Sequence, residues 1–144
     1  MNARIIFGCL DQYAKLNLPI NFSEVSILSR RDLGDGDRFQ ELAVERLYRL
    51  WFSLEPMMGI TWWNVVDGCG APGEPAVSGL FTRDMEPKLS YFALDGLINR
   101  EWRTNTVCTA DADALAAFRG FRGRYRLSWA GADGCEESLI CHLK

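Results

Sequence analysis

The spacing of hydrophobic residues changes along the 144-residue chain and predicts a series of alternating elements. Apolar residues recur at helical spacing in residues 2–16 and again in residues 38–54, where charged residues occupy the opposite face. Residues 20–28 are rich in strand formers. Residues 57–68 carry a continuous apolar run that is typical of a strand covered on both faces, as in parallel sheets. With a third helix predicted over residues 85–102, this order favours right-handed parallel units of an α/β fold.

The C-terminal part of the chain follows a different pattern. Residues 123–129 alternate between apolar and polar side chains, and the alternation resumes after a turn at residues 130–134. We therefore expect a terminal β-hairpin. The α/β part has only two predicted strands, and an isolated parallel pair leaves both of its edges unpaired. The sequence therefore looks truncated, and another chain or further residues of a longer protein are expected to complete the sheet.

Two loops between these elements are polar or rich in glycine and proline. The loop at residues 68–76 is rich in glycine and proline. In the loop at residues 32–37, three aspartates lack the spacing of an EF-hand, and no glutamate follows at the bidentate position. A solvated loop ahead of a helix explains the aspartates better, with Asp37 and Gln40 as a capping box.

The overall charge gives no sign of a nucleic-acid or membrane partner. Sixteen basic and 19 acidic residues leave a net charge of −3, which offers no general attraction for nucleic acid or for an anionic membrane. The arginine-rich segment at residues 118–126 is expected to form the solvent-exposed face of an edge strand and not an RNA-binding surface. The sequence contains no apolar run of transmembrane length and no visible signal peptide.

Residues that bind metals or act as nucleophiles are sparse. Five cysteines without C-x-x-C spacing argue against a zinc site and against a complete disulfide framework, although a Cys135–Cys141 bridge across the hairpin stays open. His142 is the only histidine and lies far in sequence from any good nucleophile, so a Ser-His-Asp arrangement is not expected. We expect neither a metal nor a cofactor.

One carboxylate, Glu24, lies inside the first predicted strand. A charged side chain is costly in a buried strand unless it is paired, hydrogen-bonded or used. Side chains at the carboxyl ends of strands line the active sites of α/β barrels and open α/β sheets. Glu24 is therefore either a catalytic residue or a structural carboxylate paired with Arg30, with Arg31 or with a neighbour outside this chain, and the strand context leaves both alternatives open.

Trp62, Trp63 and Asp67 end the second predicted strand and should open on the same face of the fold as Glu24. A tryptophan ring stacks on the apolar face of a sugar, and its indole N–H can bind a hydroxyl. Because adjacent strand residues point to opposite faces, we expect one tryptophan to face inward and the other to pack against helices. The alternative is that both tryptophans belong to the core.

Three segments resemble, in order, the C-terminal part of glycoside hydrolase family 10, the endo-β-1,4-xylanases. They are LPINFSEV (18–25), GITWWNVVDG (59–68) and GLFTRDMEPKLSYFALDGLI (79–98). The resemblance covers roughly residues 5–103. It implies the last two βα units of a (β/α)8 TIM barrel followed by a C-terminal β-hairpin extension, which is a truncated barrel.

The same resemblance assigns roles to residues of this chain. Glu24 matches the catalytic nucleophile at the end of the seventh strand, and Trp63 matches the tryptophan that lines the subsite of the cleaved sugar. Trp62 and Asp67 are further substrate-binding candidates. The chain departs from the family pattern at Asn64, where glycine is usual, and it lacks the Asn-Glu pair that carries the acid/base residue. Because retaining hydrolysis needs two carboxyl groups about 5–5.5 Å apart, the chain alone is expected to be inactive.

The resemblance divides the chain into residues 1–105, a portion of a TIM-barrel glycosidase domain, and residues 106–144, a linker with the appended hairpin. It implies part of a retaining endo-β-1,4-xylanase-like hydrolase that acts on xylan or a related plant β-glycan, with the missing N-terminal part of the barrel as a partner. The intact parent is expected to be secreted or periplasmic. Two alternatives remain open, a catalytically inactive carbohydrate-binding remnant and a self-assembling structural α/β module.

Overall fold

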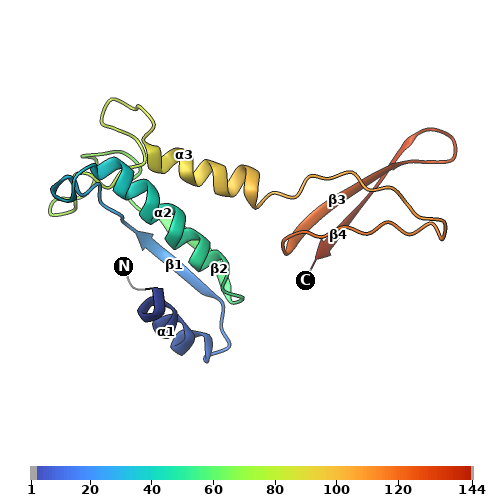
Figure 1. The fold of residues 1–144 in the computed structure, drawn as a ribbon, viewed down its shortest axis with the longest axis horizontal. Helices are drawn as coiled ribbons and strands as arrows, with labels where there is room; N and C mark the ends of the chain where they lie inside the picture. Colours follow the sequence, from blue (N-terminus) through green and yellow to red (C-terminus); the bar gives the residue numbers. More distant parts are fainter. Residues whose placement is uncertain (1–2, 144) are drawn as a thin grey trace. The chain divides into compact units, whose positions relative to one another are not determined.

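The computed structural model describes residues 3–143, whose helices and strands are drawn in Figure 1. In chain order they are α1 (Ala3–Ala14), β1 (Ile20–Val25), the 3₁₀ turn η1 (Arg31–Leu33), α2 (Gly36–Phe52), β2 (Met57–Trp62), α3 (Leu89–Gly96), the π-helical turn η2 (Leu97–Glu101), β3 (Gly123–Ala130) and β4 (Glu136–Leu143). Strands β1 and β2 pair in parallel, and β3 and β4 pair antiparallel. The predicted order of elements, the parallel pair and the terminal hairpin are confirmed.

The chain forms two compact units. Unit 1 is Met1–Gly96 and unit 2 is Leu97–Lys144. Unit 1 contains the parallel sheet with α1, α2 and α3, whereas unit 2 contains the hairpin. The predicted division between residues 105 and 106 comes from the family resemblance and stays a prediction.

The core of unit 1 forms where α2 packs on the parallel sheet. Trp51 of α2 contacts Phe22 of β1 with ring centroids 4.7 Å apart, and Tyr48 contacts Trp62 of β2 at 6.4 Å. Burial raises the pKa of the Tyr48 hydroxyl to about 12, because the charged phenolate is poorly solvated there. The buried positions along α2 repeat at helical spacing: Gly36, Gln40, Ala43, Val44, Leu47, Tyr48 and Trp51. The helical periodicity of residues 38–54 therefore identifies the face of α2 that packs on the strands.

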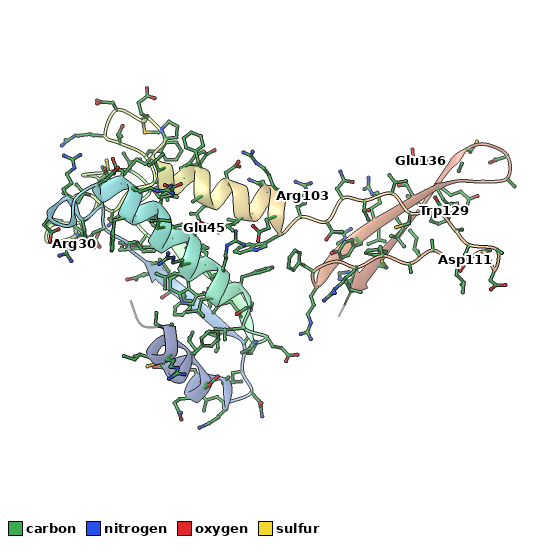
Figure 2. All side chains as sticks on the ribbon, viewed as in Figure 1. Arg30, Glu45, Arg103, Asp111, Trp129 and Glu136 are labelled. Carbon is green, nitrogen blue, oxygen red and sulfur yellow. The ribbon has the colours of Figure 1, made fainter. Side chains whose placement is uncertain are left out.

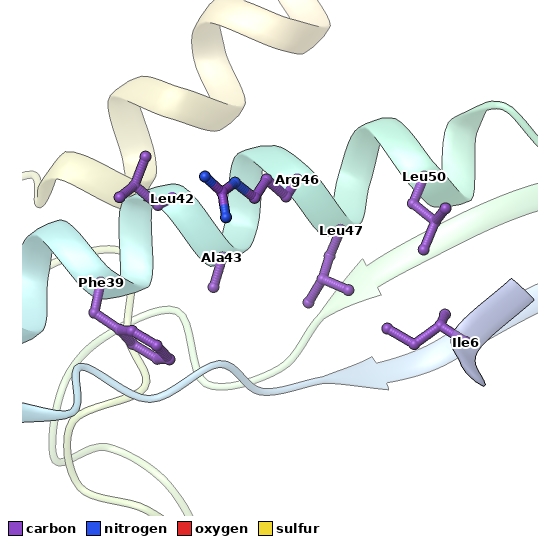
Figure 3. A pocket seen from close by; sticks show the side chains of 7 residues that line it. All are labelled: Ile6, Phe39, Leu42, Ala43, Arg46, Leu47 and Leu50. Atoms are coloured by element: carbon purple, nitrogen blue, oxygen red, sulfur yellow. The ribbon is translucent and has the colours of Figure 1, made fainter. Parts of the chain in front are cut away.

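A further strip of α2 faces α1 and leaves an apolar groove of about 380 Å³ (Figure 3). Its lining is mostly aliphatic and comes from both helices: Ile6, Phe39, Leu42, Ala43, Arg46, Leu47 and Leu50. Phe39 is 37% exposed, so the apolar stripe predicted for this helix is only partly buried. One amphipathic helix thus serves both the core and an open groove.

The prediction that β2 is covered on both faces is wrong. The strand ends at Trp62, Thr61 is exposed, and Met58 is 71% exposed. The sheet of unit 1 is only two strands wide, so residues along its edges keep contact with solvent. The continuous apolar run correctly predicted a strand, but it did not predict how far the side chains of that strand are buried in this chain.

The predicted capping box at the start of α2 is also wrong. The N-cap is Asp35, whose carboxylate accepts the backbone N–H of Arg38 at 3.1 Å. Asp37 instead accepts the hydroxyl of Ser29 at 2.7 Å. Gln40 turns into the interior of unit 1 and is fully buried. The N-terminal turn is therefore capped two residues earlier than predicted, which leaves Asp37 and Gln40 for tertiary contacts.

The hairpin of unit 2 shows the predicted alternation, with Tyr125 opposite Cys141 in the antiparallel register. The indole of Trp129 donates to Glu137 at 3.1 Å, and Asp111 in the preceding loop closes a turn by accepting two backbone N–H groups (Figure 2). All five cysteines are free, so the Cys135–Cys141 bridge is not formed.

No helix within residues 3–143 is both long and apolar enough to cross a lipid bilayer.

Candidate functional site

The carboxyl ends of β1 and β2 meet because the two strands run parallel. Val25 lies opposite Trp62 in the register, and the backbone N–H of Trp63 donates to the carbonyl oxygen of Val25 at 2.9 Å. Glu24 precedes Val25 by one residue and therefore lies at the same end of the sheet. The fold thus brings Glu24 and the two tryptophans to the carboxyl end of the two strands, as we expected from the strand order.

Glu24 is exposed, which corrects the expectation of a buried carboxylate. Its side chain makes no hydrogen bond or ion pair with another residue in the described part of the chain. The guanidinium of Arg30 instead engages Asp32 at 2.5 and 2.7 Å, and Arg31 does not pair with Glu24 either. The pairing of Glu24 with Arg30 or Arg31 is therefore not formed. Its carboxylate is open to a ligand.

The two tryptophans lie in different environments, because Trp62 ends β2 and Trp63 follows the strand. Trp62 contacts Tyr48 of α2, and its buried Nε1 has no hydrogen-bond partner within residues 3–143. Trp63 is 40% exposed, and its Nε1 donates to Glu74 Oε1 at 2.9 Å. Because this N–H is already in use, the ring face of Trp63 is what remains for a ligand.

Asp67 is held by contacts within unit 1. Its Oδ1 accepts the backbone N–H of Gly79 at 2.7 Å, and Lys88 Nζ lies 3.1 Å from its Oδ2. The Lys88 side chain is only 4% exposed and also lies 3.8 Å from Asp37 Oδ1. Asp67 therefore ties the loop after β2 to the start of α3. Its predicted contact with substrate stays a prediction.

We expect Lys88→Met to lower the free energy of unfolding of unit 1 by about 2 kcal/mol, because Asp67 loses its buried cation. The expected loss is smaller than for a fully buried pair, since Asp67 keeps some contact with solvent. Urea denaturation followed by circular dichroism at 222 nm measures the change. The matched control is Lys15→Met, which removes an exposed lysine just after the end of α1 and should change little. If adding Asp67→Asn to Lys88→Met recovers none of the loss, this account of the pair is wrong.

Sequence reasoning missed Glu74, whose carboxylate collects three donors in the loop after β2. Trp63 Nε1 donates to Oε1, whereas Asn64 Nδ2 at 2.6 Å and the backbone N–H of Ala71 at 3.1 Å donate to Oε2. The Asn64 amide and then the Trp63 indole hold the pKa of Glu74 below its usual 4.5. The carboxylate thus keeps its charge above that lowered pKa and loses it only as the pH falls through it. The available signal was an acidic residue in a loop otherwise rich in glycine and proline.

The described residues offer no metal centre. Within residues 3–143, no group of three or more His, Cys, Asp or Glu side chains could hold a metal ion.

No family model matches the chain. One curated relative, the anti-sigma-I factor RsgI6 of Acetivibrio thermocellus, is 28% identical over 130 residues, which are 89% of this chain and 16% of the relative. Two solved β-glucuronidases have similar folds. The Bifidobacterium dentium enzyme complexed with coumarin-3-O-glucuronide is 21% identical with a TM-score of 0.54, over 64% of this chain and 16% of that one. The Faecalibacterium prausnitzii enzyme is 24% identical with a TM-score of 0.54, over 68% and 18%.

The similarity to the two solved enzymes concerns the fold, whereas the similarity to the curated relative is one of sequence. Part of the chain has the architecture of a segment of TIM-barrel glycosidases. The chain spans less than a fifth of the length of each of these three proteins. The assignment to family 10, the xylanase activity and the truncated barrel stay predictions.

Proposed function

We propose that this chain is part of a retaining glycoside hydrolase acting on a plant β-glycan such as xylan, with Glu24 as the nucleophile. The observation that carries the proposal is the unpaired, exposed carboxylate of Glu24 at the carboxyl end of β1, where Trp63 also lies. Active sites of (β/α)8 barrels form at this end of the strands. The fold similarity to TIM-barrel glycosidases supports the same placement.

In this mechanism the Glu24 carboxylate attacks the anomeric carbon, and a glycosyl–Glu24 ester forms as the glycosidic bond breaks. A second carboxyl group protonates the departing oxygen, then deprotonates the water that hydrolyses the ester. Asp67 is badly placed for that second role, since Lys88 and the Gly79 N–H already occupy its oxygens. The acid/base residue is therefore expected on a different part of the barrel, and the exposed ring of Trp63 would carry the sugar bound beside Glu24.

A barrel completed with the first six βα units of a family 10 xylanase tests the proposal. A 2-deoxy-2-fluoroxylobioside with a good leaving group should lose that group and add the mass of one 2-deoxy-2-fluoroxylobiosyl residue to the completed barrel. Peptide mapping should place that mass on Glu24, and Glu24→Gln should prevent the labelling. A folded, completed barrel that stays unlabelled would contradict the proposal.

A non-catalytic carbohydrate-binding role is the second candidate. It is favoured because the curated relative is named an anti-sigma-I factor and not a hydrolase. For this role, xylo-oligosaccharide binding should be lost in Trp63→Ala and kept in Glu24→Gln, and the completed barrel should remain unlabelled.

A further inference from the structure

We propose that Glu74 is a positioning residue that holds the Trp63 indole as a fixed platform for a neutral sugar ring. This inference rests on the proposed function, because it assigns how the site near Glu24 would orient its ligand. Glu74 itself need not touch the sugar. It acts through the ring that it holds.

The first support is that Glu74 fixes the edge of the Trp63 ring. An exposed side chain such as that of Trp63, which follows the end of β2, normally samples several rotamers, and ordering it at the moment of binding costs free energy. The hydrogen bond from Trp63 Nε1 to Glu74 Oε1 restrains the ring before any ligand arrives. Because the bond takes up the polar edge, the 40% exposed indole presents mainly an apolar surface. Such a surface fits the C–H face of a pyranose.

The second support is that Glu74 is itself held in place. Asn64 donates to Oε2 at 2.6 Å from a left-handed backbone conformation with φ of 57°, and the Ala71 N–H donates to the same oxygen. The loop also approaches closely at Gly70. A Cβ there would lie 2.7 Å from Glu74 Oε2 and 2.9 Å from Asn64 Nδ2, so a side chain at this position would displace the contact.

The third support is the negative charge of the Glu74 carboxylate. The acceptor that restrains Trp63 is a carboxylate, and charged acceptors form stronger hydrogen bonds than neutral ones. Its negative charge also lies at the rim of the ring, where it disfavours a sugar that carries a carboxylate of its own. The ligand class that fits is therefore a neutral pyranose, as in unsubstituted xylan, and not a uronic acid.

The test uses the full chain labelled with ¹⁵N-tryptophan, and Trp63→Phe assigns the indole N–H signal of Trp63. In Glu74→Gln the new amide cannot accept from all three donors. We expect the Trp63 indole signal to shift and to exchange with water roughly tenfold faster, and xylotriose to bind about fivefold more weakly. Glu86→Gln is the matched control, because this glutamate lies in the same loop and only its backbone is hydrogen-bonded. It should leave both quantities unchanged.

A double-mutant cycle separates positioning from a general structural role. If Glu74 acts through the ring, Trp63→Phe and Trp63→Phe/Glu74→Gln should bind xylotriose equally. An equal loss of affinity from Glu74→Gln in both backgrounds would overturn the proposal, and so would an unchanged indole signal in Glu74→Gln. If xylotriose moves no Trp63 signal in the unmodified chain, the platform role fails, whereas the proposed function is still decided separately by the labelling of Glu24 in the completed barrel. The indole exchange rate would still report the Glu74 contact by itself.

Discussion

Glu24→Gly in the completed barrel is expected to lower the rate of xylan hydrolysis by roughly 1,000-fold or more, which corresponds to about 4 kcal/mol of activation free energy. Without the carboxylate, no glycosyl–enzyme ester can form. The space left at the end of β1 should admit a small anion. Azide can then attack the anomeric carbon of a β-xyloside with an activated leaving group, and the product should be the α-glycosyl azide.

Two measurements check this expectation, a rate of hydrolysis with and without azide and the anomeric configuration of the product. The matched control is Glu45→Gln, which removes an exposed carboxylate paired with Arg49 on α2 and should leave the rate within about twofold. A Glu24→Gly barrel that keeps near-normal activity would contradict the role of Glu24 as nucleophile. A β-configured azide product would contradict the direct displacement.

Gln40→Leu is expected to lower the free energy of unfolding of unit 1 by about 2–4 kcal/mol, although leucine has a similar size and is more apolar. Gln40 is fully buried, and its Nε2 donates to the carbonyl of Ile27 at 2.7 Å and to that of Gly79 at 3.2 Å. Its Oε1 accepts the hydroxyl of Ser90 at 3.1 Å. Leucine leaves these buried groups without partners, and an unpaired buried polar group costs more than the lost hydrogen bond itself.

Urea denaturation at 222 nm measures this effect, because unit 1 contains α1, α2 and α3. Gln12→Leu makes the same exchange on α1, where Gln12 is exposed and accepts only from Lys15, and it should change stability by less than about 0.5 kcal/mol. Ser90→Ala should have an intermediate effect of about 1 kcal/mol, since it removes one donor and leaves one acceptor unpaired. Equal stability of Gln40→Leu and Gln12→Leu would show that the buried amide does not hold the three segments together.

Gln40 also explains how the candidate site is supported. Its hydrogen-bond partners are Ile27, which follows β1, Gly79 in the loop after β2, and Ser90 at the start of α3. A single side chain therefore joins three segments that adjoin the carboxyl ends of the strands. The Asp67–Lys88 ion pair joins the same loop to the residue just before α3. The loop that carries Glu74 is therefore anchored at both ends, which is a requirement for a precise site on irregular backbone.

The order of the elements was predictable from the sequence alone, for local physical reasons. Helical spacing in residues 38–54 and alternation in residues 123–129 report backbone periodicity directly, and both elements form where predicted. A helical crossover between two strands favours parallel pairing, and β1 and β2 are parallel. Parallel pairing in turn fixes Glu24 and Trp63 at one end of the sheet without any knowledge of side-chain contacts.

Only the tertiary structure decided which side chains are covered and what they bind. Glu24 is exposed because the sheet is two strands wide, whereas its strand context predicted burial. The local sequence around Asp37 and Gln40 fits a capping box. In the folded chain, however, Asp37 instead accepts the hydroxyl of Ser29, and Gln40 bonds to three segments that are distant in sequence. The bond between Glu74 and Trp63 likewise spans a loop whose path no periodicity specifies. Periodicity is a property of neighbouring residues, whereas burial and hydrogen-bond partners depend on residues that are distant in sequence, so only the folded chain assigns them.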